Sequence, residues 1–94
     1  MYRQSSSAIT RKIAGDTLLI PVTQVGVDLQ KVYLLNEPAA AIWDLLQTPH
    51  SADDLIAELQ ETYEAPEDTI RRGVEAVLED LTSRAFVVTE PTDG

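Results

Sequence analysis

Residues 31–46 constrain the fold most, because a short apolar strand there runs into a helix with no loop between them. Asn36 stands where a helix N-cap residue belongs, and Pro38 falls in the first helical turn, where a missing N–H group costs nothing. The chain's only tryptophan, Trp43, lies within this helix. We therefore expect a strand at 31–35 and a helix at 37–47.

Apolar residues recur at helical spacing in two further segments, so three helices follow this strand. Ser51 opens the second helix, and Asp54 three residues later completes a capping-box pattern. The third helix is expected from about residue 67 to about residue 84, with two acidic residues in its first turn, where they complement the helix dipole. The apolar positions expected to be buried are Ile42, Trp43, Leu45, Leu46, Leu55, Ile56, Leu59, Tyr63, Ile70, Val74, Val77, Leu78 and Leu81.

The N-terminal third is expected to form a hairpin, because β-prone runs at 9–14 and 17–22 flank the turn pair Gly15-Asp16. Together with the strand at 31–35, this gives a three-stranded antiparallel sheet followed by three helices. The fold class is therefore α+β, with a winged-helix-like architecture. We expect one domain at 9–89, between flexible tails at 1–8 and 90–94.

The strand at 31–35 is unusual because four consecutive residues, 32–35, are all apolar. In a small three-stranded sheet the helices cover only one face, so the opposite face normally alternates to polar side chains. The sequence therefore suggests that a partner covers part of this strand.

The composition excludes several functional classes. Seven Lys and Arg residues stand against 16 Asp and Glu residues, a net charge of −9. Nucleic-acid binding depends on basic side chains, so this charge argues against it; the acidic surface serves either solubility or steering toward a basic partner. The chain has no cysteine, no signal-peptide pattern and no run near the roughly 18 apolar residues of a membrane span. We expect a cytoplasmic protein that binds no membrane.

No catalytic, metal or cofactor site is expected. His50 is the only histidine, without a second metal ligand or a nucleophile context, and the acidic residues at 53–61 fit a solvated helix face. Arg71 fits either an ion pair with an acid one turn away or an anchor for an acidic group on a bound peptide. Gly73 lies within the third helix, where glycine reduces helix stability by about 1 kcal/mol relative to alanine. It marks either a close approach of another backbone or neutral drift.

Six segments in order resemble the PqqD-like family, whose founding member is the small protein D of pyrroloquinoline quinone biosynthesis. These segments are YLLNE (33–37), AAIWDLL (40–46), SADDLI (51–56), YEAP (63–66), VLEDL (77–81) and AFVV (85–88). The resemblance covers roughly residues 9–88 and implies three strands followed by three helices. It also implies a recognition element for ribosomally synthesised, post-translationally modified peptides, in pathways to quinone cofactors, lasso peptides and other products.

In such proteins the leader segment of a precursor peptide adds as a strand beside the third strand, against the third helix, and is delivered to a modifying or leader-processing enzyme. The resemblance thereby implies a peptide-binding site at Lys31, Val32, Tyr33, Leu34, Arg71, Val74, Glu75 and Leu78. Two alternatives stay open. A DNA-binding winged helix needs a basic recognition helix, whereas the third helix has two arginines among several acids. A structural subunit of an enzyme complex would not be stable alone.

Overall fold

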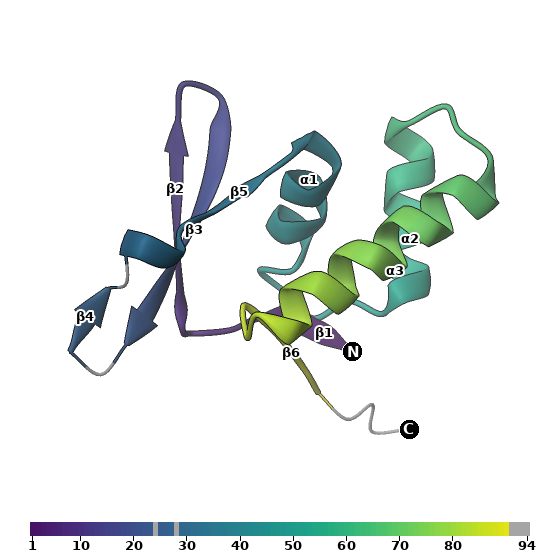
Figure 1. The fold of residues 1–94 in the computed structure, drawn as a ribbon. Helices are drawn as coiled ribbons and strands as arrows, with labels where there is room; N and C mark the ends of the chain where they lie inside the picture. Colours follow the sequence, from purple (N-terminus) through teal and green to yellow (C-terminus); the bar gives the residue numbers. More distant parts are fainter. Residues whose placement is uncertain (24, 28, 91–94) are drawn as a thin grey trace.

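The computed structural model describes residues 1–23, 25–27 and 29–90. A β-hairpin lobe stands beside three helices, and the longest helix crosses in front of the helix that precedes it in the chain (Figure 1). The elements in chain order are β1 (Tyr2–Gln4), β2 (Ala8–Ile13), β3 (Asp16–Thr23), β4 (Gly26–Val27), a 3₁₀ turn (Leu29–Lys31), β5 (Tyr33–Leu35), α1 (Glu37–Leu45), α2 (Ala52–Thr62), α3 (Glu67–Ser83) and β6 (Val87–Thr89). The expected α+β class is confirmed.

Strand β3 is the centre of the main sheet. Strand β2 pairs antiparallel along one side of it, and β5 and β4 pair antiparallel with its first and last residues on the other side. The β3–β5 register places Thr17 opposite Leu35 and Leu19 opposite Tyr33. Among the described strands none pairs with the outer edge of β5. The sheet therefore has four strands where three were expected, and β5 is an open edge.

The chain termini form a second, two-stranded sheet that the sequence did not predict. Strand β1 pairs antiparallel with β6, with Tyr2 opposite Thr89 and Gln4 opposite Val87. The Tyr2 N–H also donates to the His50 carbonyl at 2.7 Å, and the Tyr2 side chain packs on the core. Residues 2–4 of the expected tail at 1–8 therefore form a strand with a long-range partner. Of the expected tail at 90–94, residues 91–94 lie outside the described residues.

The expected helix starts are confirmed. The Asn36 side-chain oxygen accepts the Ala39 N–H at 3.0 Å, and Ser51 and Asp54 form a reciprocal capping box. Helix α3 ends in a Schellman motif, in which the Phe86 N–H donates to the Leu81 carbonyl and Ala85 adopts a φ of 64°. This turn places Phe86 in the core and directs the chain into β6, the short strand at the C-terminal end.

Two strand boundaries differ from the sequence-based expectation. The hairpin turn is Ala14-Gly15, with φ values of 53° and 86°, so the turn lies one residue earlier than predicted. Residues 31 and 32 are not in a strand, because Lys31 ends the 3₁₀ turn and β5 begins at Tyr33. Strand β5 is accordingly only three residues long, and α1 follows after the single residue Asn36.

The core lies between the helices and the inner face of the main sheet. Trp43 lies in this core and is 1% exposed. Its indole N–H donates to the Thr10 hydroxyl at 2.8 Å. Of the predicted core positions, Leu45, Tyr63 and Val77 are only partly buried. The buried apolar set is Leu19, Leu35, Ala39, Ile42, Trp43, Leu46, Leu55, Ile56, Leu59, Ile70, Val74, Leu78, Leu81, Phe86 and Val87.

Candidate functional site

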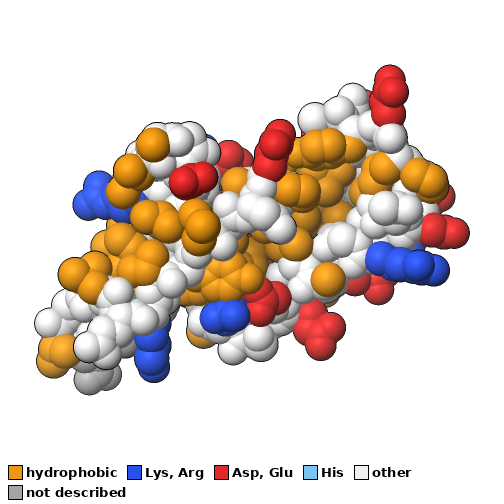
Figure 2. Space-filling model, turned by 45° about the horizontal axis from the view of Figure 1, so that its top comes forward, with side chains coloured by type: hydrophobic (Ala, Val, Ile, Leu, Met, Phe, Trp, Pro, Cys, Tyr) orange, Lys and Arg blue, Asp and Glu red, His pale blue; other side chains and the backbone are white. Residues whose placement is uncertain are grey.

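A groove separates the open edge of β5 from α3. Its first hollow encloses about 280 Å³ between Tyr33–Leu35 on the strand side and Ala76, Val77 and Asp80 on the helix side. A second hollow of about 460 Å³ extends it along α1 and α3 past Pro38, Tyr63 and Ile70. Both hollows share Asn36, Ala76 and Val77, so they form one continuous depression, here called the β5–α3 groove. Hydrophobic side chains line this hollow between the sheet lobe and the helices (Figure 2).

The helix wall of the groove is low because its residues are small. A Cβ atom built on Gly73 would meet no heavy atom within 4 Å, and Ala76 one turn further on is exposed. The space that a side chain at residue 73 would enter is therefore open, so within the described residues no close contact requires a glycine there. Gly73 and Ala76 instead leave room above α3 beside Val77.

Gly73→Ala should stabilise the domain by about 0.5–1 kcal/mol, because alanine is the better helix former and the added methyl group meets open space. For a domain of this size the melting temperature should rise by about 2–8 °C. Thermal unfolding followed by circular dichroism measures the change. A lower melting temperature would mean that Gly73 has a conformational role that its helical backbone does not reveal.

A polar cluster closes one end of the groove. The Tyr33 hydroxyl donates to the Asp80 carboxylate, and the Arg84 Nε–H donates to the same carboxylate at 3.0 Å. The Arg84 guanidinium carbon lies 4.1 Å from the centre of the Tyr33 ring, which also meets Phe86 edge-on at 6.4 Å. The Tyr33 hydrogen bond, supported by Arg84, lowers the pKa of Asp80, and the same hydrogen bond raises the pKa of Tyr33. This cluster ties β5 to α3.

Tyr33→Phe should reduce stability by about 0.5–1.5 kcal/mol at pH 7, because only the hydrogen bond to Asp80 is removed while the ring remains. Since the folded state lowers the Asp80 pKa, this contribution is present in full above the ordinary carboxyl pKa and is lost as the pH falls through the lowered value. Urea unfolding at pH 7 and pH 3 tests this. A difference from the parent that is larger at pH 3 than at pH 7 would contradict the assignment.

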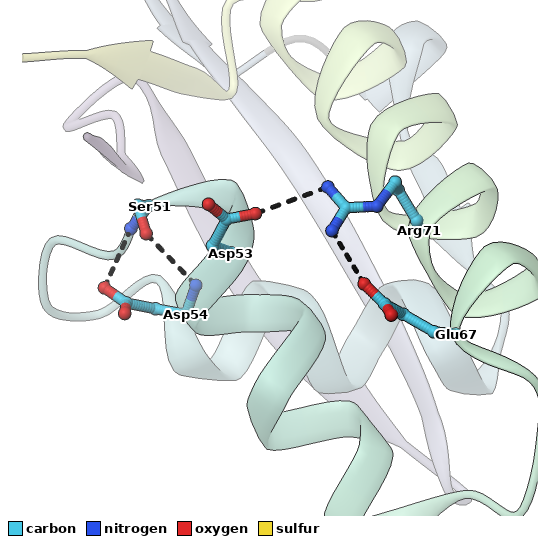
Figure 3. Close-up of polar contacts among 5 residues, drawn as sticks. All are labelled: Ser51, Asp53, Asp54, Glu67 and Arg71. Carbon is cyan, nitrogen blue, oxygen red and sulfur yellow. Dashed lines mark hydrogen bonds and ion pairs between the residues drawn. The ribbon is translucent and has the colours of Figure 1, made fainter.

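Arg71 lies outside the groove. Its guanidinium donates to Glu67 at 2.8 Å and to Asp53 at 3.3 Å, bridging the start of α3 to the start of α2 near the Ser51–Asp54 capping box (Figure 3). Of the two interpretations of Arg71, the ion pair is confirmed. All three side chains are well exposed, so the bridge contributes little to stability.

The structure brings together only part of the predicted site. Tyr33, Leu34 and Val74 line the groove. Lys31 and Val32 border a different hollow beside Arg84, and Glu75 and Leu78 border a third beside Tyr2. The helix-side residues of the groove were not predicted as site residues, and they are Gly73, Ala76, Val77 and Asp80. Their signal is a stripe of small or apolar residues at 73, 76 and 77 that continues to Asp80, adjacent to the buried stripe of the same helix.

The part of the chain that the structure describes also bears on metal and membrane binding. No group of three or more His, Cys, Asp and Glu side chains there could hold a metal ion. No helix among these residues is long and apolar enough to span a membrane. His50 lies in the α1–α2 connection, with its ring nitrogen 2.9 Å from the Thr48 carbonyl oxygen.

Two solved structures share this fold over nearly the whole chain. One, described as TbiB1 in complex with the TbiA(beta) leader peptide, has a TM-score of 0.77 at 17% identity, covering 96% of this chain and 99% of that one. The other, a lasso peptide synthetase B1 complexed with the leader peptide, has a TM-score of 0.75 at 20% identity, covering 94% and 98%. No curated protein sequence matches significantly.

A sequence model of one protein family also matches the chain. The model of coenzyme PQQ synthesis protein D (PqqD) matches residues 5–87, which include the main sheet, all three helices and both walls of the groove. Because this match spans most of the 94 residues, the chain belongs to the PqqD family.

Proposed function

We propose that this protein binds the leader segment of a ribosomally synthesised precursor peptide by strand addition at β5 and delivers it to a modifying or leader-processing enzyme. The observation that carries the proposal is the open edge of β5 beside an apolar groove. The opposite edge of the sheet, β2, exposes Arg11 and Lys12, and charged side chains on an edge strand discourage pairing. Strand β5 itself carries only Tyr33, Leu34 and Leu35.

Affinity and selectivity would come from different parts of the groove. The unpaired main-chain groups of β5 supply hydrogen bonds to any extended peptide. Alternate side chains of the added strand point to one face. Here that face is turned toward the two hollows, which share Ala76 and Val77. Burying one large apolar side chain there contributes about 1.5–3 kcal/mol, so two such residues at the right spacing would distinguish one leader from another.

The related structures support this use of the groove. Both proteins with the same fold were solved with a leader peptide bound, at identities that establish the shared fold only. We place the strand side of the site at Tyr33, Leu34 and Leu35, as the sequence suggested for the first two. We move the helix side from Arg71, Glu75 and Leu78 to Gly73, Ala76 and Val77, because the latter line the groove.

An isotope-labelled sample titrated with the leader peptide of the precursor encoded beside this gene tests the proposal. Amide chemical shifts should change mainly at residues 33–36 and 73–80, on the two walls of the groove. Slow exchange of the β5 amide protons after binding would add direct support for strand pairing. Changes confined to α2 and the turn at 48–51, with β5 silent, would reject this site.

The alternatives are less well supported. Helix α3 carries Arg71 and Arg72 among several acidic residues, and Arg71 forms ion pairs with Glu67 and Asp53. These features and the net charge of −9 oppose DNA binding. We propose that the protein acts without catalysis and without a cofactor of its own. The cytoplasmic location remains a prediction from the sequence, and a structural subunit of an enzyme complex remains an alternative.

A further inference from the structure

The outer face of the main sheet is largely apolar, and its side chains do not pack against the core. Residues two apart on a strand share a face, and so do residues directly opposite each other on paired strands. Leu19 is fully buried against the helices, so Leu18, Ile20 and Val22 of β3 point to the other side. The register then adds their partners, and the apolar side chains of this outer face include Ile9, Leu18, Ile20, Val22, Val27 and Leu34.

None of these six side chains belongs to the hydrophobic core or packs against it. Val22, Val27 and Leu34 are 39%, 46% and 57% exposed, and the other three are partly covered. A sheet with one solvated face normally alternates to polar residues there, whereas contiguous exposed apolar patches mark interaction sites. Hydrophobic side chains are also visible over the sheet lobe beside the hollow (Figure 2).

We infer that this outer face is the docking surface for the enzyme that receives the peptide, and that the bound leader completes it. The inference rests on the proposed function. A leader strand added to the open edge of β5 extends the same sheet. Half of its side chains enter the groove, and the alternate half lie on the outer face next to Leu34. An enzyme seated there contacts protein and peptide together.

Charge favours an enzyme over a second copy of this chain. Each copy carries a net charge of −9, which opposes self-association. The charge is also unevenly distributed: residues 1–35 contain four basic and two acidic side chains, and residues 36–94 contain three basic and fourteen acidic ones. On the outer face Arg11 lies opposite Leu18, and Asp16 lies opposite Ile13. The helices therefore repel an acidic partner, whereas the weakly charged outer face of the sheet accepts one that has an apolar contact surface.

The test measures two affinities for each variant: that for the leader peptide by fluorescence anisotropy, and that for the enzyme encoded beside this gene by surface plasmon resonance. Val22→Glu with Val27→Glu should weaken enzyme binding at least about tenfold, or 1.4 kcal/mol, while leader affinity stays within about twofold. Ala57→Glu with Gln60→Glu adds the same two charges to exposed positions of α2 and should change neither affinity. If the glutamates prevent folding, Val22→Thr with Val27→Thr keeps the β-branched shape and replaces the test.

Leader-loaded protein should bind the enzyme at least about fivefold more tightly than free protein. The inference would be overturned if the variants at Val22 and Val27 bound the enzyme as tightly as the parent. It would also be overturned if the parent dimerised through this face in sedimentation velocity. Equal affinity with and without the leader would refute the shared surface. A parent that fails to bind the leader would instead refute the proposed function, so the two failures are distinguishable.

Discussion

Trp43→Ala should destabilise the domain by about 3–5 kcal/mol, a large part of the roughly 5–15 kcal/mol that holds a small domain folded. Trp43 is 1% exposed and belongs to a core cluster formed by residues of the sheet and all three helices, so its loss leaves a cavity in the core. The substitution also removes the partner of the Thr10 hydroxyl, which holds α1 to β2. The melting temperature should fall by more than about ten degrees.

Urea unfolding followed by far-ultraviolet circular dichroism measures this change without the lost fluorophore. Trp43→Phe is the matched control, because it keeps most of the apolar contact and loses only the indole hydrogen bond and some volume. We expect a smaller destabilisation of about 1–2 kcal/mol for it. If Trp43→Ala were as stable as Trp43→Phe, the indole ring would not be the centre of the core, and the placement of α1 would be wrong.

Local sequence signals identified the helices, because a helix start is encoded by adjacent residues. Asn36 caps α1 and Ser51 caps α2, each by accepting an N–H from the residue three positions on. The strand-to-helix junction at 31–46 was the strongest constraint that the sequence placed on the fold. The same junction borders the groove, where Asn36 lines both hollows. The family resemblance and the structure therefore agree where the signals are local.

Long-range pairing was not accessible to the same reasoning. Strand β1 is only three residues long and precedes a serine-rich run, and its partner β6 lies at the other end of the chain. The hairpin turn was shifted by one residue because Ala14 occupies a left-handed conformation that is uncommon for alanine. Periodicity cannot reveal either feature.

The residues that line the groove were anticipated better on the strand side than on the helix side. Only one edge of β5 is unpaired among the described strands, so each apolar residue of β5 is a candidate for peptide binding. Helix α3 has three faces, against α2, the groove and solvent, and its apolar stripe does not show which part is buried. Val74 and Leu78 lie beneath the surface, whereas Gly73 and Ala76, which carry no hydrophobic signal, form the groove wall.

Ala76→Trp should lower the affinity for a leader peptide by about 10–100-fold while leaving the domain folded. Ala76 is exposed and lines both hollows where they meet, so an indole ring there fills the groove at its midpoint. Excluding one apolar side chain of the peptide forfeits about 1.5–3 kcal/mol of burial, which corresponds to this loss of affinity. The cost to α3 itself is only the difference in helix propensity, about 0.5 kcal/mol.

Ala57→Trp on the exposed side of α2 is the matched control, since it adds the same ring to a helix and lies outside both hollows. Fluorescence anisotropy of a labelled leader peptide measures both variants against the parent, with thermal unfolding as the check on folding. Equal affinity for the Ala76→Trp variant and the parent would show that the leader does not lie against α3. Strand addition at β5 alone cannot explain such a result, because a peptide paired with β5 has to direct alternate side chains toward that helix.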